Sequence, residues 1–237
     1  MKLNDVFTRK GLIFIVLFIA VAAIADRINF SALLGTANQT FTLFQFFGPI
    51  AGAFLGPAIG AISVLFAELI NFVLGAKPFE LFTILRLAPM VIAAIYFGRY
   101  GIKGLKNFAA FVPLVCMALF MLHPVGQQAW YYSLYWLIPV AAHLFGKRLF
   151  FRSLGATFTA HAIGSVIFLY TIPSTPMLWI TLIPIVAFER TMFALGITVS
   201  YVGFNTVLSK LDNIVPRKLV NVDPRYVISK KMFGVQA

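Results

Sequence analysis

Apolar residues run along most of this chain in blocks that are separated by short polar or basic segments. A block of roughly 17–25 apolar residues has the length of a helix that crosses a bilayer. We therefore predict an all-α, polytopic α-helical membrane protein with about 6–8 transmembrane helices. The apolar blocks lie at about 11–26, 41–55, 58–75, 79–98, 107–122, 128–146, 153–170 and 187–208.

The stretch 41–75 needs a break. As one helix its 35 residues would be about 52 Å long, whereas the hydrocarbon core is only about 30 Å thick. Gly56-Pro57 is the natural place for the break, because glycine permits a turn and proline ends a helix. The other glycines at four-residue spacing, Gly48, Gly52 and Gly60, predict grooves in which helix backbones approach closely.

Composition supports a membrane environment. Of the residues, 61% are hydrophobic and 11% are charged, whereas a soluble domain carries about 25% charged residues. The net charge of +12 would suggest nucleic acid in a soluble protein, but in a membrane protein it indicates basic cytoplasmic segments. We therefore expect no nucleic-acid partner and a location in the cell membrane.

The basic residues fall where a break at Gly56-Pro57 places them on one side of the membrane. Of the 19 Lys and Arg residues, 15 lie at the N-terminus, at 99–106, at 147–152 and after residue 209. The positive-inside rule then predicts that both termini are cytoplasmic.

The two ends of the apolar region leave choices open. The first 25 residues also resemble a signal peptide, although we favour an uncleaved first span. Pro173, Pro176 and Pro184 interrupt the apolar stretch that precedes the last block. We therefore expect 172–185 to lie at the outer interface or to re-enter the membrane, with the last helix beginning near Ala187. The chain then divides into one transmembrane domain, 1–208, and a basic cytoplasmic tail, 209–237.

Ionisable groups within apolar spans are costly and mark candidate functional sites. Glu68 and Arg86 lie at one predicted depth in adjacent antiparallel spans, and Glu189 and Arg190 open the last helix on the same side. Two interpretations remain: a paired network that holds helices together, or the floor of an outward-facing binding cavity.

Aromatic and amide side chains crowd the block that begins near residue 128. They form either an interfacial aromatic belt or a site that stacks on a flat heterocyclic solute. His161, in the middle of a later block, is either an interhelical hydrogen-bonding group or a ligand contact. The crowd comprises Gln127, Gln128, Trp130, Tyr131, Tyr132, Tyr135 and Trp136.

The sequence carries no motif for catalysis or for a bound cofactor. It contains no phosphate-binding loop GxxxxGK[ST], no HExxH, no GxSxG and no local Cys/His cluster, so we expect no metal, no cofactor and no enzyme activity. An intramembrane enzyme that uses His161 and Glu189 has no motif to support it.

The stretch 45–100 resembles the substrate-binding S component of energy-coupling factor transporters. The stretch reads QFFGPIAGAFLGPAIGAISVLFAELINFVLGAKPFELFTILRLAPMVIAAIYFGRY. The resemblance rests on Gly56-Pro57 at a helix end, on a glycine-rich helix that ends in the polar Glu68 and Asn71, on Pro78 in a short loop, and on Gly98. It departs from the family in its number of predicted spans and in lacking alanines four residues apart in the first helix.

The resemblance implies a subunit that captures a vitamin-like micronutrient from outside the cell. It also implies separate transmembrane scaffold and ATPase subunits as partners. Arg86, Glu68 and the aromatic crowd would then contact the solute. A rival hypothesis is a non-catalytic structural or accessory subunit of a larger membrane complex, which the glycine grooves and the basic tail would equally suit.

Overall fold

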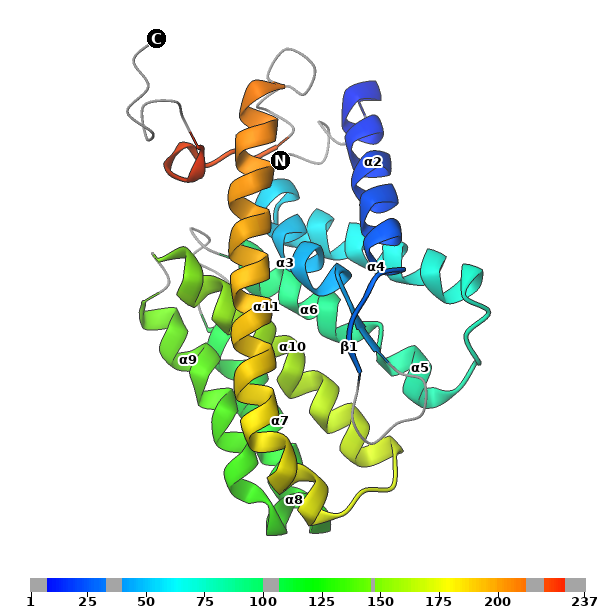
Figure 1. The fold of residues 1–237 in the computed structure, drawn as a ribbon, viewed down its shortest axis with the longest axis vertical. Helices are drawn as coiled ribbons and strands as arrows, with labels where there is room; N and C mark the ends of the chain where they lie inside the picture. Colours follow the sequence, from blue (N-terminus) through cyan, green and yellow to red (C-terminus); the bar gives the residue numbers. More distant parts are fainter. Residues whose placement is uncertain (1–7, 33–39, 100–106, 146–147, 212–219, 229–237) are drawn as a thin grey trace.

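The computed structural model of the protein describes residues 8–32, 40–99, 107–145, 148–211 and 220–228. These residues are mostly helical, with one small two-stranded sheet (Figure 1). The α-helices are α2 (Arg9–Ala25), α3 (Phe44–Leu55), α4 (Pro57–Leu74), α5 (Leu81–Leu85), α6 (Ala88–Gly98), α7 (Phe108–Leu122), α8 (Pro124–Gln128), α9 (Leu137–Leu144), α10 (Leu149–Thr171) and α11 (Pro176–Lys210). The 3-10 helices are η2 (Trp130–Trp136) and η3 (Pro224–Tyr226), and the strands are β1 (Asn29–Ala32) and β2 (Thr40–Thr42).

Among the described residues, four helical segments are long and apolar enough to cross a membrane. Three shorter apolar helices accompany them. The protein is therefore a helical protein with membrane-spanning character, as the apolar blocks predicted. The long segments are Pro57–Leu74, Leu81–Gly98, Leu149–Thr171 and Pro176–Lys210, and the shorter ones are Leu12–Ala25, Phe44–Leu55 and Phe108–Leu122.

The predicted break at Gly56 is confirmed. Helix α3 ends at Leu55 and α4 begins at Pro57. Gly56 adopts φ 86°, a backbone conformation that residues other than glycine rarely adopt. The turn therefore depends on glycine for its geometry and on Pro57 for the start of the next helix.

The glycine spacing also serves close packing, but each glycine plays a different part. A Cβ on Gly52 would clash with the carbonyl oxygen of Ala94 in α6, and one on Gly60 would meet the backbone of α3. Gly48 instead lies beside the side chain of Met90. Helix α6 thus packs directly on the backbone of α3, and it also contacts α4 and α10.

Helix α11 corrects one expectation. We predicted a re-entrant or interfacial segment over 172–185, but α11 is continuous from Pro176 to Lys210 and contains Pro184. A proline removes one backbone hydrogen bond, but Trp179 and Val186 on either side of it are buried, so this part of α11 is held by packing. The length limit applies only to the part within lipid, and α11 runs along most of the molecule (Figure 1).

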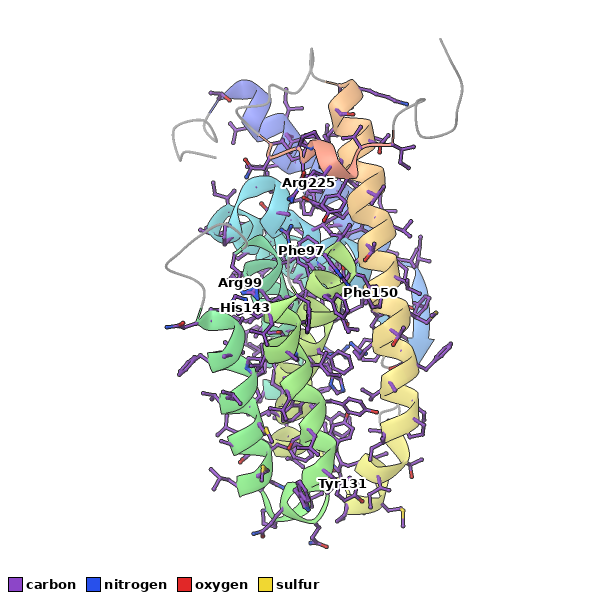
Figure 2. All side chains as sticks on the ribbon, turned by 90° about the vertical axis from the view of Figure 1, so that its left-hand side faces the viewer. Phe97, Arg99, Tyr131, His143, Phe150 and Arg225 are labelled. Carbon is purple, nitrogen blue, oxygen red and sulfur yellow. The ribbon has the colours of Figure 1, made fainter. Side chains whose placement is uncertain are left out.

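The expected span 128–146 is likewise not one helix. The chain passes from α8 through the 3-10 helix η2 into α9. Within η2 the Ser133 hydroxyl donates a 2.6 Å hydrogen bond to the carbonyl of Trp130. Pro139, near the start of α9, has no N–H with which to extend the α-helical pattern back through the aromatic run. Figure 2 shows Tyr131 of this segment near one end of the molecule, with Arg225 toward the other.

Part of the tail docks onto the helical body. Val220 is buried, the Asn221 amide donates to the carbonyl of Phe54, and Asn205 accepts from the amide of Asp223 at 2.7 Å. Hydrogen bonds from the Arg225 guanidinium lower the pKa of the Asp223 carboxyl. The described tail residues 220–228 therefore pack on the helical body and contribute Val220 to its core.

Candidate functional site

A cavity of about 360 Å³ opens among the β1–β2 hairpin, the end of α4, the junction of α5 and α6, α10 and the first half of α11. Part of the loop 27–40 forms the hairpin, and Arg27, Asn29 and Thr40 line the cavity. Thr42 of β2 donates a 2.8 Å hydrogen bond to Asp26, whose carboxylate lies 3.8 Å from the Lys77 ammonium. These contacts tie the hairpin to the end of α2 and to the loop after α4.

Six of the residues predicted to bind a solute line this one cavity. The fold brings them together from α4, the junction of α5 and α6, α10 and the first half of α11. They are Glu68, Asn71, Arg86, His161, Glu189 and Arg190.

Glu68 and Arg86 both line the cavity, but no ion pair within 4.0 Å joins them among the described residues. Arg86 lies between α5 and α6, where the helix is interrupted just before Pro89. Both side chains are half-buried. The two side chains therefore line the same cavity from different elements.

Five other predicted residues lie outside the cavity. Gln127 and Gln128 of α8 are exposed, as are Trp130 and Tyr131 of η2. Tyr135 donates a 2.8 Å hydrogen bond to the carbonyl of Ile183 and stacks on a phenylalanine of α10. These five residues therefore lie apart from the cavity, and the exposed ones among them fit the interfacial belt, the other interpretation of the sequence.

Tyr132 is the member of the crowd that does reach the cavity. Its hydroxyl lies 2.9 Å from Nε2 of His161, and Ser165 Oγ lies 3.3 Å from the same nitrogen. The Trp136 indole donates to Nδ1 of His161 at 3.3 Å. Because an indole N–H can only donate, Nδ1 must accept, and the neutral ring carries its proton on Nε2.

We expect His161→Leu to lower the thermal stability of the detergent-solubilised protein. The Tyr132 hydroxyl and the Trp136 N–H would lose their partner while buried, and each unsatisfied group costs about 1–3 kcal/mol. The same change in a Tyr132→Phe, Trp136→Phe background should lower the stability clearly less, because that background lacks the hydroxyl and the indole N–H that would be left unpaired. Equal losses in both backgrounds would show that the network does not account for the stability.

Arg190 is the most deeply buried charge in the cavity wall. It is 1% exposed, and its Cζ lies 4.6 Å from the ring centre of Phe41 and 4.4 Å from that of Phe193. Its Nη2 lies 3.5 Å from the carboxylate of Glu189. These rings and the carboxylate stabilise the cation in part, through cation–π and ionic attraction.

Two of the side chains in the cavity wall retain hydrogen-bonding capacity. Nε and Nη2 of Arg190 and Oδ1 of Asn71 are buried and have no hydrogen-bond partner among the described residues. Asn71 is 3% exposed. Buried polar groups are nearly always hydrogen-bonded, so unpaired ones in a cavity wall point to a group that completes them.

The predicted site residues did not include several residues that line the cavity. Asp26 and Lys77 are ionisable side chains at the ends of apolar blocks, which is a signal in the sequence. Phe41, Ser165 and Trp179 carry no such signal, because apolar and small residues in a membrane sequence usually only pack.

No family model matches the chain, and no solved structure matches it. It is similar to an uncharacterized protein of Methanocaldococcus jannaschii, with 29% identity over an alignment of 178 residues that covers 68% of this chain and 59% of that relative. The chain thus spans less than two thirds of the relative's length.

Proposed function

We propose that this protein is a membrane-embedded, non-catalytic subunit of an uptake system that binds a small solute in the cavity. The observation that carries the proposal is the cavity of about 360 Å³ whose wall holds buried, unpartnered polar atoms of Arg190 and Asn71. Small-molecule sites are typically about 300–1,000 Å³, mostly apolar, with a few polar groups that fix orientation.

The proposed orientation places the cavity on the outer side of the cell membrane, with both termini in the cytoplasm and about 6–8 spans in total. The start of α2 and the end of α11 lie at the same end of the molecule, and β1 and α5 lie away from it (Figure 1). The positive-inside rule favours the cytoplasm for the end that carries the basic tail.

The same proposal includes the role of an S component of an energy-coupling factor transporter, with a vitamin-like micronutrient as solute. The stretch that resembles this family forms α3, α4, α5 and α6, and Glu68, Asn71 and Arg86 of this stretch line the cavity. Because the chain has no phosphate-binding loop motif, separate ATPase and transmembrane scaffold subunits would supply the energy for release.

Native mass spectrometry of the detergent-solubilised protein, after incubation with a low-molecular-mass cell extract, tests solute binding. We expect a bound small molecule in the wild type and none in Gly164→Phe. Gly164 lines the cavity, and a Cβ added to it would meet its nearest neighbour, Pro89, only at 3.9 Å. A phenyl ring there would therefore fill the space.

Gly203→Phe is the matched control, because a Cβ on Gly203 of α11 meets nothing within 4 Å and Gly203 does not line the cavity. It should keep the solute. A bound molecule that survives Gly164→Phe would place the site elsewhere. A wild type that never retains a molecule would favour an accessory subunit without a ligand.

A further inference from the structure

Arg190 presents a particular pair of donors. Nε–H and one N–H of Nη2 point in parallel along one edge of the guanidinium plane, and these are the two nitrogens that lack hydrogen-bond partners among the described residues. This edge matches the two oxygens of a planar carboxylate, which accepts both hydrogen bonds at once. The Glu189 carboxylate, 3.5 Å from Nη2, forms an ion pair with Arg190 but leaves Nε and Nη2 without a hydrogen bond from the described residues.

Asn71, in the same cavity, needs a hydrogen-bond donor where Arg190 needs acceptors. Its Oδ1 is a buried acceptor for which the described part of the chain offers no donor. Asn71 belongs to α4 and Arg190 to α11, and both line the cavity. A ligand that completes both residues must therefore carry an acceptor pair at one point and an N–H or O–H donor at another.

The charges in the wall limit the charge of the ligand. Four basic side chains, Arg27, Lys77, Arg86 and Arg190, face three acidic ones, Asp26, Glu68 and Glu189. The surplus is one positive charge, which one negative charge on the ligand would balance. Counted in the same formal charges, a phosphate dianion would leave the cavity with one uncompensated negative charge.

We infer that the solute is a small monocarboxylate that also carries an N–H or O–H donor, with its carboxylate on the Nε and Nη2 edge of Arg190 and its donor on Oδ1 of Asn71. This inference rests on the proposed function and names the chemical class that the cavity accepts. The apolar remainder of such a solute would lie against Phe82, Phe168 and Trp179, which also line the cavity.

The test offers the wild-type protein three forms of one low-molecular-mass cell extract and measures the retained solute by mass spectrometry. One form is untreated, one has its carboxyl groups converted to methyl amides, and one is treated with phosphatase. We expect retention from the untreated and phosphatase-treated extracts, and loss of retention after amidation. Retention that survives amidation, or that phosphatase abolishes, would overturn the inference.

Variants locate the contact. Arg190→Lys keeps the charge but loses the paired donors, and it should bind the retained solute about tenfold more weakly or worse. Asn71→Leu should also bind about tenfold more weakly. Arg148→Lys is the control, since Arg148 is exposed at the start of α10 and does not line the cavity. Wild-type affinity in both cavity variants would overturn the inference.

The outcomes separate this inference from the function on which it rests. If a solute binds the wild type whether or not the extract was amidated, the proposed function stands and only the inference of a carboxylate is refuted. If the wild type retains nothing from any extract, both the carboxylate inference and the proposed function are refuted. If Arg190→Lys does not fold, the amidation arm still decides, because it uses the unaltered protein.

Discussion

Replacement of Gly52 by alanine is expected to disrupt the packing of α3 on α6. The added Cβ would clash with the backbone carbonyl of Ala94, and the backbone of Gly98 lies close as well. Neither is the flexible end of a side chain, so the helices themselves must move apart. We expect a loss of about 3 kcal/mol, at the upper end of the cost of overpacking, measured as a lower thermal unfolding temperature in detergent.

Gly203→Ala provides the matched control in a helix of the same protein. A Cβ there has open space around it, so the higher helix propensity of alanine should stabilise the protein by up to about 1 kcal/mol. The two identical substitutions are thus expected to act in opposite directions. If Gly52→Ala unfolds at the temperature of the control, the close approach of α3 and α6 would be refuted.

The sequence allowed the turn between α3 and α4 to be predicted because its physical cause is local. A length limit, a glycine and a proline coincide at Gly56-Pro57. The continuity of α11 through Pro184 could not be predicted in this way, since tertiary packing compensates for the missing hydrogen bond. The docking of 220–228 depends on contacts with Phe54 and Asn205, which are distant in sequence and carry no local pattern.

Part of the candidate site could likewise be predicted from the sequence, and part depends on the fold. Charged residues such as Glu68, Arg86 and Arg190 stand out in an apolar sequence, and the fold gathers them around one cavity. The aromatic crowd stands out equally, but its orientation depends on η2 being a 3-10 helix. A 3-10 helix has three residues per turn instead of 3.6, so α-helical spacing in the sequence could not show which of these side chains turn toward the cavity.

Arg190→Met is expected to destabilise the ligand-free protein strongly, although the guanidinium is itself incompletely hydrogen-bonded. The side chains of Arg190 and Glu189 are 2% and 14% exposed, and they form an ion pair at 3.5 Å. Breaking a buried ion pair by removing one member costs about 3–5 kcal/mol. Thermal or denaturant unfolding in detergent would measure this loss.

The double variant Glu189→Gln, Arg190→Met distinguishes the ion pair from simple packing. Replacing both charges with uncharged side chains of similar size is often neutral or stabilising, so the double variant should recover most of what the single variant loses. The pair Asp223–Arg225 serves as the reference cycle. Its atoms lie closer, at 2.7 Å, but the Arg225 side chain is 70% exposed, and exposed pairs contribute little. Strictly additive effects at Glu189 and Arg190 would mean that burial does not couple them, and Arg190 would then have to be held in place by the phenylalanine rings alone.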